Sequence, residues 1–99
     1  MTREYFHFTW KKLLPSILKH GLLPSERTGD SAYEGRTVKR IYLLEPEDVD
    51  EGGWFYGNVL LRVRIPKGVT VKRTVFAEGV YVTKPIPPSH ISIQEARDE

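Results

Sequence analysis

The sequence of 99 residues contains no cysteine, which excludes a disulfide-linked scaffold and any chemistry that needs a thiolate. It also lacks an apolar run near the roughly 20 residues that a membrane-spanning helix requires. The first residues, with Arg3 and Glu4 among aromatic side chains, lack the apolar core of a signal peptide. We therefore expect a cytoplasmic protein that does not interact with a membrane.

A strong charge of either sign is also missing. The 15 Lys and Arg residues against 13 Asp and Glu residues leave a formal net charge of +2. This small excess is well below the basic stripe that is typical of nucleic-acid-binding proteins, so charge alone selects no partner. The three histidines lack the spacing of metal ligands, and the acidic run over residues 45–51 lacks the pattern of a calcium loop. The sequence predicts no metal site.

Repeats and low-complexity segments are absent, whereas apolar residues are plentiful. A hydrophobic fraction of 39% with 11% aromatic residues is sufficient for a compact core. At this length two domains would each fall near the lower limit for burying a core. We predict a single domain over residues 1–94, followed by a charged tail over residues 95–99.

The start of the chain has the clearest local pattern. Residues 4–9 are aromatic and β-branched and predict a strand, with Phe6 and Phe8 on the face that is the better candidate for the core. The opposite face carries Tyr5, His7 and Thr9. A helix follows over residues 10–20, because apolar residues recur there at helical spacing, and Gly21 is placed to end it.

The rest of the chain predicts short strands. A long loop over residues 25–36 comes first, and a short helix begins near Glu45 and ends at Gly52 and Gly53. The strands are expected over residues 38–44, 54–65, 79–83 and 90–93. A tight turn at residues 66–68 is expected to pair residues 69–71 with the strand before it. The sum is an α+β domain with one main N-terminal helix against a bent, mainly antiparallel sheet.

Several short motifs follow one another in a distinctive order. They are Tyr5-Phe6-His7-Phe8-Thr9, Leu14-Pro15-Ser16-Ile17-Leu18, His20-Gly21-Leu22, Ile41-Tyr42-Leu43, the strand Val59–Arg64, and Gly79-Val80-Tyr81-Val82-Thr83 before Ile86-Pro87-Pro88. In this order they resemble the ADP-ribosyltransferase-like fold. The closing strand is similar to that of the catalytic lobe of RNA 2′-phosphotransferases. The opening His-x-Thr and the Leu-Pro-Ser-Ile helix are similar to those of DNA-modifying ADP-ribosyltransferase toxins.

The resemblance implies a binding site for NAD between the two halves of a split sheet. It implies that His7 hydrogen-bonds the ribose next to the nicotinamide, and that Thr9 supports the adjacent ribose or adenosine. It also implies that Tyr42 lies near the nicotinamide. Glu78 is the carboxylate nearest to the position of the acid that holds the ribose 2′-hydroxyl in that family.

Three arginines in or beside the long loop are candidate ligands for the pyrophosphate of NAD, because guanidinium groups match its oxygens. They are Arg27, Arg36 and Arg40. A solvated loop is the alternative interpretation of these residues.

The proposed chemistry explains why such residue types are needed. Breaking the bond between ribose and nicotinamide builds positive charge on the sugar, and a nearby carboxylate stabilises that charge. A histidine and an aromatic wall hold the donor in place and exclude water. The hypothesis is a minimal ADP-ribosyltransferase-like enzyme in which His7, Tyr42 and Glu78 are catalytic, NAD is the substrate, and the acceptor is a nucleic acid or a protein.

Each of these residues also fits an ordinary role. His7 is equally well a half-buried polar residue bonded to the backbone, Tyr42 a packing residue of a sheet, and Glu78 an acid at the start of a strand. Trp10, Trp54, Phe55 and Tyr56 are candidates for base stacking, although core or lid packing is the plainer interpretation. The alternative function is a non-catalytic module on the same fold that binds a protein or nucleic acid. Small size and the lack of the separate N-terminal lobe of the phosphotransferases favour it. The one-residue offset between Glu78 and the acid of the toxins does so too.

Overall fold

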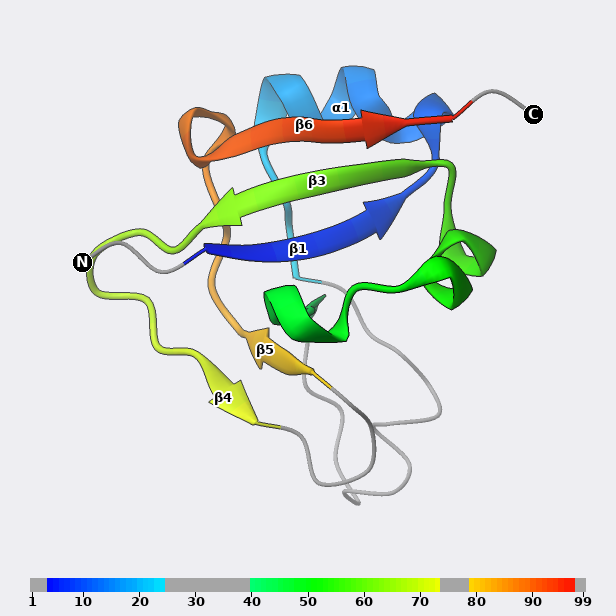
Figure 1. The fold of residues 1–99 in the computed structure, drawn as a ribbon. Coiled ribbons are helices and arrows are strands. Elements are labelled where there is room, and N and C mark those ends of the chain that lie inside the picture. The colour runs from blue at the N-terminus through cyan, green and yellow to red at the C-terminus, as the bar shows by residue number, and fades with distance from the viewer. Residues whose placement is uncertain (1–3, 25–39, 74–78, 98–99) are drawn as a thin grey trace.

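The computed structural model describes residues 4–24, 40–73 and 79–97 of the chain (Figure 1). Its helical elements are the 3-10 helices η1 (Lys11–Leu13), η2 (Pro46–Asp48), η3 (Glu51–Tyr56) and η4 (Pro88–His90) and the α-helix α1 (Leu14–His20). Its strands are β1 (Glu4–Thr9), β2 (Ile41–Leu43), β3 (Val59–Arg64), β4 (Lys72–Arg73), β5 (Val80–Val82) and β6 (Ile91–Ala96). One short α-helix with two small antiparallel sheets makes a small α+β domain, which confirms the predicted fold class.

The first sheet has the order β1-β3-β6, and α1 lies along it (Figure 1). Leu61 of the central strand β3 lies between His7 of β1 on one side and Ile93 of β6 on the other. Ile17 of α1 belongs to the same buried cluster as Leu61 and Val63. The same cluster includes Ile41, Leu43, Val80 and Val82 of the second sheet, so the core lies between α1 and both sheets.

The two faces of β1 are not used as the sequence predicts. Tyr5 belongs to the main buried cluster, whereas Phe6 is only half-buried and Phe8 is buried outside that cluster. The Phe8 ring instead packs edge to face on Trp54, with the ring centres 5.0 Å apart. The prediction that the Phe face forms the main core is therefore wrong, because α1 and the core cover the opposite face of β1 while η3 covers the Phe8 side.

The second sheet has the order β2-β5-β4. The turn after β3 forms as predicted, with the Val69 N–H donating to the Pro66 carbonyl at 3.2 Å. The strand that follows does not pair with β3, because β1 and β6 occupy both edges of β3. It pairs with β5, so the chain crosses from the first sheet to the second at this turn.

Several predicted boundaries differ from the observed ones. The strand predicted over residues 54–65 is observed only over Val59–Arg64, because residues 51–56 form η3, and the helix predicted over residues 10–20 consists of η1 followed by α1. Gly52 and Gly53 do not end a helix but lie inside η3, and a Cβ atom at Gly53 would collide with the Phe8 ring. Residues 95 and 96 continue β6, and the Arg97 N–H donates to the Asn58 carbonyl at 2.8 Å. The described part of the predicted tail is therefore attached to the first sheet.

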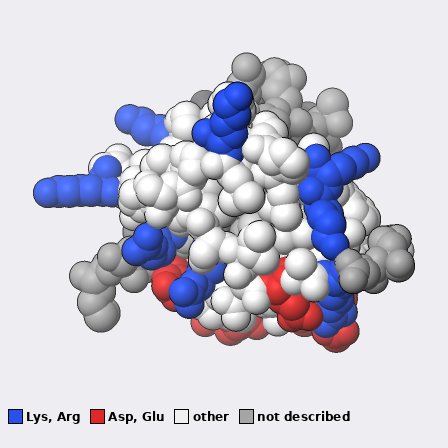
Figure 2. Space-filling model, turned by 90° about the horizontal axis from the view of Figure 1, so that it is seen from above, with Lys and Arg blue, Asp and Glu red and all other residues white. Residues whose placement is uncertain are grey.

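Figure 2 views the molecule from the side that carries α1 and β6. Lys and Arg side chains stand around the edge of this face, acidic side chains gather along one part of that edge, and the centre is uncharged. Leu18 of α1 and Ile93 of β6 are exposed large apolar residues, as is Leu13 at the end of η1. None of the helices in the described part of the chain combines the length and apolar character needed to cross a membrane.

Candidate functional site

The two sheets are joined by backbone hydrogen bonds at one position and separate next to His7. Phe6 of β1 and Leu44, just after β2, exchange both backbone hydrogen bonds, at 2.8 and 2.7 Å. In this antiparallel register, the next hydrogen-bonded pair would be Phe8 with Tyr42. Among the described strands that pair is not formed, and the Tyr42 carbonyl instead accepts a hydrogen bond from His7 Nδ1 at 2.7 Å. The imidazole therefore supplies a hydrogen bond to the Tyr42 carbonyl at the point where backbone pairing between the two sheets ends.

The bond to Tyr42 determines the orientation and tautomer of the His7 ring. A backbone carbonyl can only accept, so Nδ1 must carry the hydrogen atom. In the neutral imidazole, Nε2 is then the acceptor nitrogen. This contact is the ordinary backbone-bonded role foreseen for His7, and it also holds the ring in one orientation at the split.

Tyr42 belongs to a polar cluster on one face of the second sheet. Tyr42 and Tyr81 lie directly opposite each other in β2 and β5, with ring centres 6.1 Å apart. Arg40, two residues before Tyr42, donates from Nη1 to the Tyr42 hydroxyl at 3.2 Å, and its guanidinium lies 4.2 Å over the Tyr81 ring. Only 3% of Arg40 is exposed. The arginine therefore holds both rings in place from within the fold.

Thr9, the last residue of β1, is buried. Gly57 packs so closely on the Thr9 backbone that a Cβ atom at Gly57 would collide with the Thr9 carbonyl oxygen. The end of the strand that carries His7 is thus held by a close backbone contact. Thr9 lies two residues from His7 on this strand, and its implied role beside the ribose or adenosine of NAD stays a prediction.

The structure therefore brings together three predicted site residues, His7, Tyr42 and Arg40. Three others, Arg27, Arg36 and Glu78, lie outside the described residues. In the ranges 4–24, 40–73 and 79–97, no group of three or more His, Asp or Glu side chains is arranged to hold a metal ion. Tyr81 joins the cluster without having been predicted as a site residue, because its contact with Tyr42 depends on the pairing of β2 with β5.

Comparisons with known proteins assign no family. No protein-family model matches the chain, and no curated protein matches it.

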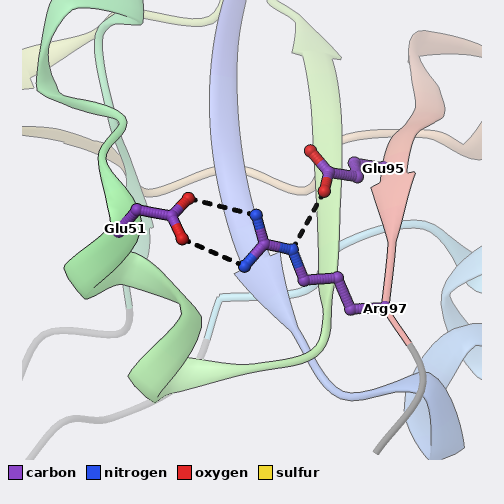
Figure 3. A network of polar contacts seen from close by, with 3 residues as sticks. All are labelled: Glu51, Glu95 and Arg97. Atoms are coloured by element: carbon purple, nitrogen blue, oxygen red, sulfur yellow. Dashed lines mark hydrogen bonds and ion pairs between the residues drawn. The ribbon is translucent and has the colours of Figure 1, made fainter.

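A second polar cluster lies at the end of β6 and was not foreseen from the sequence (Figure 3). Arg97 donates from Nη1 and Nη2 to the two carboxylate oxygens of Glu51 at 3.3 and 3.0 Å, and from Nε to Glu95 at 2.9 Å. Its guanidinium also lies 3.9 Å over the Trp54 ring. The cluster attaches η3 to the end of β6. The sequence offered only a mixed-charge tail as a signal, which is the usual composition of a solvated segment.

Because of this cluster, the free energy of unfolding is expected to decrease at acid pH. The hydrogen bond from Arg97 lowers the pKa of Glu51 below its ordinary value of 4.5, and the attraction of the Arg97 charge lowers that pKa further. A lowered carboxyl pKa stabilises the fold above the unfolded-state pKa, and this contribution disappears as the pH falls through the folded-state pKa. We expect wild type to be more stable than Glu51→Gln at pH 7, with the difference shrinking as the pH falls below 4.5 and through the lowered pKa of Glu51. Urea unfolding midpoints measured across this range, at low and high salt, check the prediction.

A matched control is Glu47→Gln, which removes an exposed acid that has no ion pair within the described residues. This variant should show no comparable loss at pH 7. A difference between wild type and Glu51→Gln that persists unchanged at low pH would contradict the assignment to the Glu51 carboxylate.

Proposed function

We propose that this protein binds NAD at the split between its two sheets and acts as a minimal ADP-ribosyltransferase-like enzyme. In this proposal the acceptor of ADP-ribose is a nucleic acid or a protein. The supporting observation is the hydrogen bond from His7 Nδ1 to the Tyr42 carbonyl at 2.7 Å. It places an oriented imidazole at the point where the sheets part and beside the Tyr42–Tyr81 cluster.

Four described residues have a defined task in the proposal, and Thr9 supports the adjacent ribose or adenosine. The Nε2 side of His7 accepts a hydrogen bond from a hydroxyl of the ribose next to the nicotinamide. Tyr42 and Tyr81 offer aromatic surface to the nicotinamide ring, and their separation of 6.1 Å is typical of a packed aromatic pair. Arg40 is buried. It therefore acts by fixing the two rings and by adding positive charge for the pyrophosphate, rather than as an exposed clamp.

The reaction also needs a carboxylate, and Glu78 has that role in the proposal. The bond from the ribose to the nicotinamide nitrogen breaks, and its electron pair leaves with neutral nicotinamide. The Glu78 carboxylate stabilises the positive charge that builds on the sugar, and it takes the proton of the acceptor group that attacks the same carbon. Replacing Glu78 with glutamine keeps its size and removes this charge.

The proposal is tested by combining a binding and a turnover measurement. The melting temperature should rise with NAD concentration and saturate, because a ligand that binds only the folded state stabilises it. Nicotinamide should be released when single-stranded DNA, RNA or a protein mixture is added as acceptor. Glu78→Gln should keep the thermal shift and lose the release.

The possible outcomes separate the candidate functions. Saturable NAD binding with no nicotinamide release under any condition would exclude the proposed catalytic activity and support the non-catalytic module. The absence of both a thermal shift and release would overturn the proposal altogether. Adenosine monophosphate, which lacks the nicotinamide and its ribose, serves as the matched control ligand.

A further inference from the structure

The end of the strand that carries His7 is held by η3. A Cβ atom at Gly53, inside η3, would collide with the Phe8 ring, and Trp54 packs edge to face on the same ring with the ring centres 5.0 Å apart. Gly57, directly after η3, is packed just as closely on the backbone of the last residue of β1. The two residues that follow His7 are therefore placed by η3 and the residue after it.

The position of η3 depends in turn on contacts with other elements. A 3-10 helix has poorer hydrogen-bond geometry than an α-helix, and runs longer than three or four residues are uncommon. The helix η3 has six residues, and two of them are glycines, which lose the most conformational freedom on folding. Its own hydrogen bonds are therefore a weak restraint, and contacts near its two ends are needed to fix it.

Arg97, directly after β6, makes contacts near both ends of η3. Its guanidinium forms two hydrogen bonds with the Glu51 carboxylate, at 3.3 and 3.0 Å (Figure 3), and lies 3.9 Å over the Trp54 ring. Its backbone N–H donates to the carbonyl of Asn58, two residues after η3, at 2.8 Å. The Asn58 side-chain oxygen accepts from the Lys11 N–H, two residues after β1, at 2.8 Å. We call Arg97 with Glu51, Trp54 and Asn58 the Arg97 clamp.

The clamp lies at the surface, so its main effect is expected to be local. The side chain of Arg97 is 42% exposed and that of Glu51 is 83% exposed. Ion pairs between exposed side chains contribute little to the free energy of unfolding of a whole domain. A hydrogen bond weakens steeply when its distance or angle changes, so a small shift of β1 is enough to disturb a side-chain bond near η3. Loss of the clamp is therefore expected to affect the neighbourhood of η3 more than the stability of the fold.

We infer that Arg97 is a positioning residue for His7 and acts on it through η3 and Phe8. With the clamp in place, the end of β1 is fixed and His7 Nδ1 donates to the Tyr42 carbonyl at 2.7 Å. Without it, η3 and the Phe8 ring shift, and the imidazole loses its fixed orientation at the split between the sheets. The expected effect on NAD binding rests on the proposed function. The effect on the hydrogen bond from His7 to Tyr42 does not.

The ring proton of His7 tests the inference without NAD. The Nδ1–H group bonded to Tyr42 should exchange slowly with water in wild type, and nitrogen-15 NMR measures its exchange rate. Arg97→Met removes both hydrogen bonds to Glu51 and keeps an apolar chain beside Trp54. It should raise the exchange rate of the His7 proton roughly fivefold or more, as expected for one weakened hydrogen bond. A folded Arg97→Met protein with an unchanged exchange rate would overturn the inference, and so would rapid exchange in wild type.

Two further variants control for a general loosening of the fold. Arg64→Met makes the same change at an arginine that donates from Nη2 to the Ser89 carbonyl of η4 at 3.0 Å, and it should leave the His7 proton unchanged. Glu51→Gln keeps the size of the side chain and removes its charge, so it should raise the exchange rate less than Arg97→Met does. If circular dichroism shows that Arg97→Met does not fold, an unchanged His7 proton in Glu51→Gln overturns the inference. Equal acceleration in Arg64→Met and Arg97→Met does so too, because a loosened fold then accounts for both.

NAD affinity gives a second readout. Calorimetric titration should show a dissociation constant about fivefold higher for Arg97→Met than for wild type, and less than about twofold higher for Arg64→Met. Arg97→Lys keeps the charge but not the two-pronged contact with Glu51, so its dissociation constant should lie between those of wild type and Arg97→Met. If wild type does not bind NAD, the proposed function fails, and the His7 exchange rates still decide the inference. If wild type and Arg97→Met bind NAD equally well, Arg97 has no positioning role in that site, whatever the exchange rates show.

Discussion

His7→Ala is expected to weaken NAD binding roughly tenfold and to lower nicotinamide release by about two orders of magnitude. One lost hydrogen bond of about 1–1.5 kcal/mol corresponds to roughly a tenfold change in affinity. The larger effect on release is expected because the ribose must be held in its reactive orientation while the bond breaks. Calorimetric titration with NAD and a nicotinamide assay measure the two effects. This prediction rests on the proposed function.

His7→Asn separates the two roles of the imidazole. The asparagine amide nitrogen takes the place of Nδ1 and is able to donate to the Tyr42 carbonyl, but nothing takes the place of Nε2. We expect the free energy of unfolding of this variant to be close to that of wild type. His7→Ala should lose about 1 kcal/mol of this free energy, because it loses the hydrogen bond. Both variants should lose NAD affinity to a similar extent.

The control for both variants is His20→Ala, which removes an exposed histidine from the end of α1. It should leave NAD binding unchanged and cost at most a few tenths of a kcal/mol through the helix dipole. Unchanged NAD affinity in His7→Ala and His7→Asn would show that the split does not bind NAD through His7, whatever happens to their stability.

Local patterns in this sequence predicted elements better than they predicted pairing. The helix before Gly21 and the second half of the strand predicted over residues 54–65 follow from apolar spacing, because each buries one face against the core. The partner of β4 did not follow from spacing, since the turn at residues 66–68 is equally compatible with a hairpin. A hairpin of β3 with β4 is prevented because β1 and β6 occupy both edges of β3. Which strands pair with β3 is determined by the whole chain and not by the turn.

The same limit applies to the candidate site. His7 and Tyr42 are 35 residues apart, and their contact exists only because Phe6 and Leu44 fix the meeting point of the sheets. Tyr81 was recognisable as a strand residue, but its place opposite Tyr42 requires the register of β5. Arg97 lay in a segment whose composition predicts a free tail. Its partners Glu51 and Trp54 are distant in sequence and lie within an unforeseen 3-10 helix.

Gly21→Ala is expected to cause the largest loss of stability of any single substitution considered, about 3 kcal/mol or more. Gly21 ends α1 with a φ of +80°, and its N–H donates to the Ile17 carbonyl at 2.7 Å. A methyl group there would collide with the Ile86 carbonyl oxygen. That oxygen belongs to the Leu22–Ile86 bridge, whose two hydrogen bonds are both 2.9 Å long. Alanine must therefore displace a fully buried Ile86 or abandon the backbone conformation that ends the helix.

The magnitude follows from two separate costs, and Gly68→Ala measures one of them alone. A left-handed conformation costs a non-glycine residue roughly 1–2 kcal/mol, and weakening the two hydrogen bonds of the bridge adds about 1 kcal/mol for each. Gly68 has a similar φ of +89°, but nothing lies within 4 Å of the position its Cβ would take. Gly68→Ala should therefore lose only the conformational part, and Gly21→Ala should melt at least about 10 °C below wild type. Equal losses in the two variants, measured by thermal and urea unfolding, would show that backbone conformation alone matters. A larger loss at Gly21 would show that the bridge from the end of α1 to the segment after β5 contributes to holding the two sheets together.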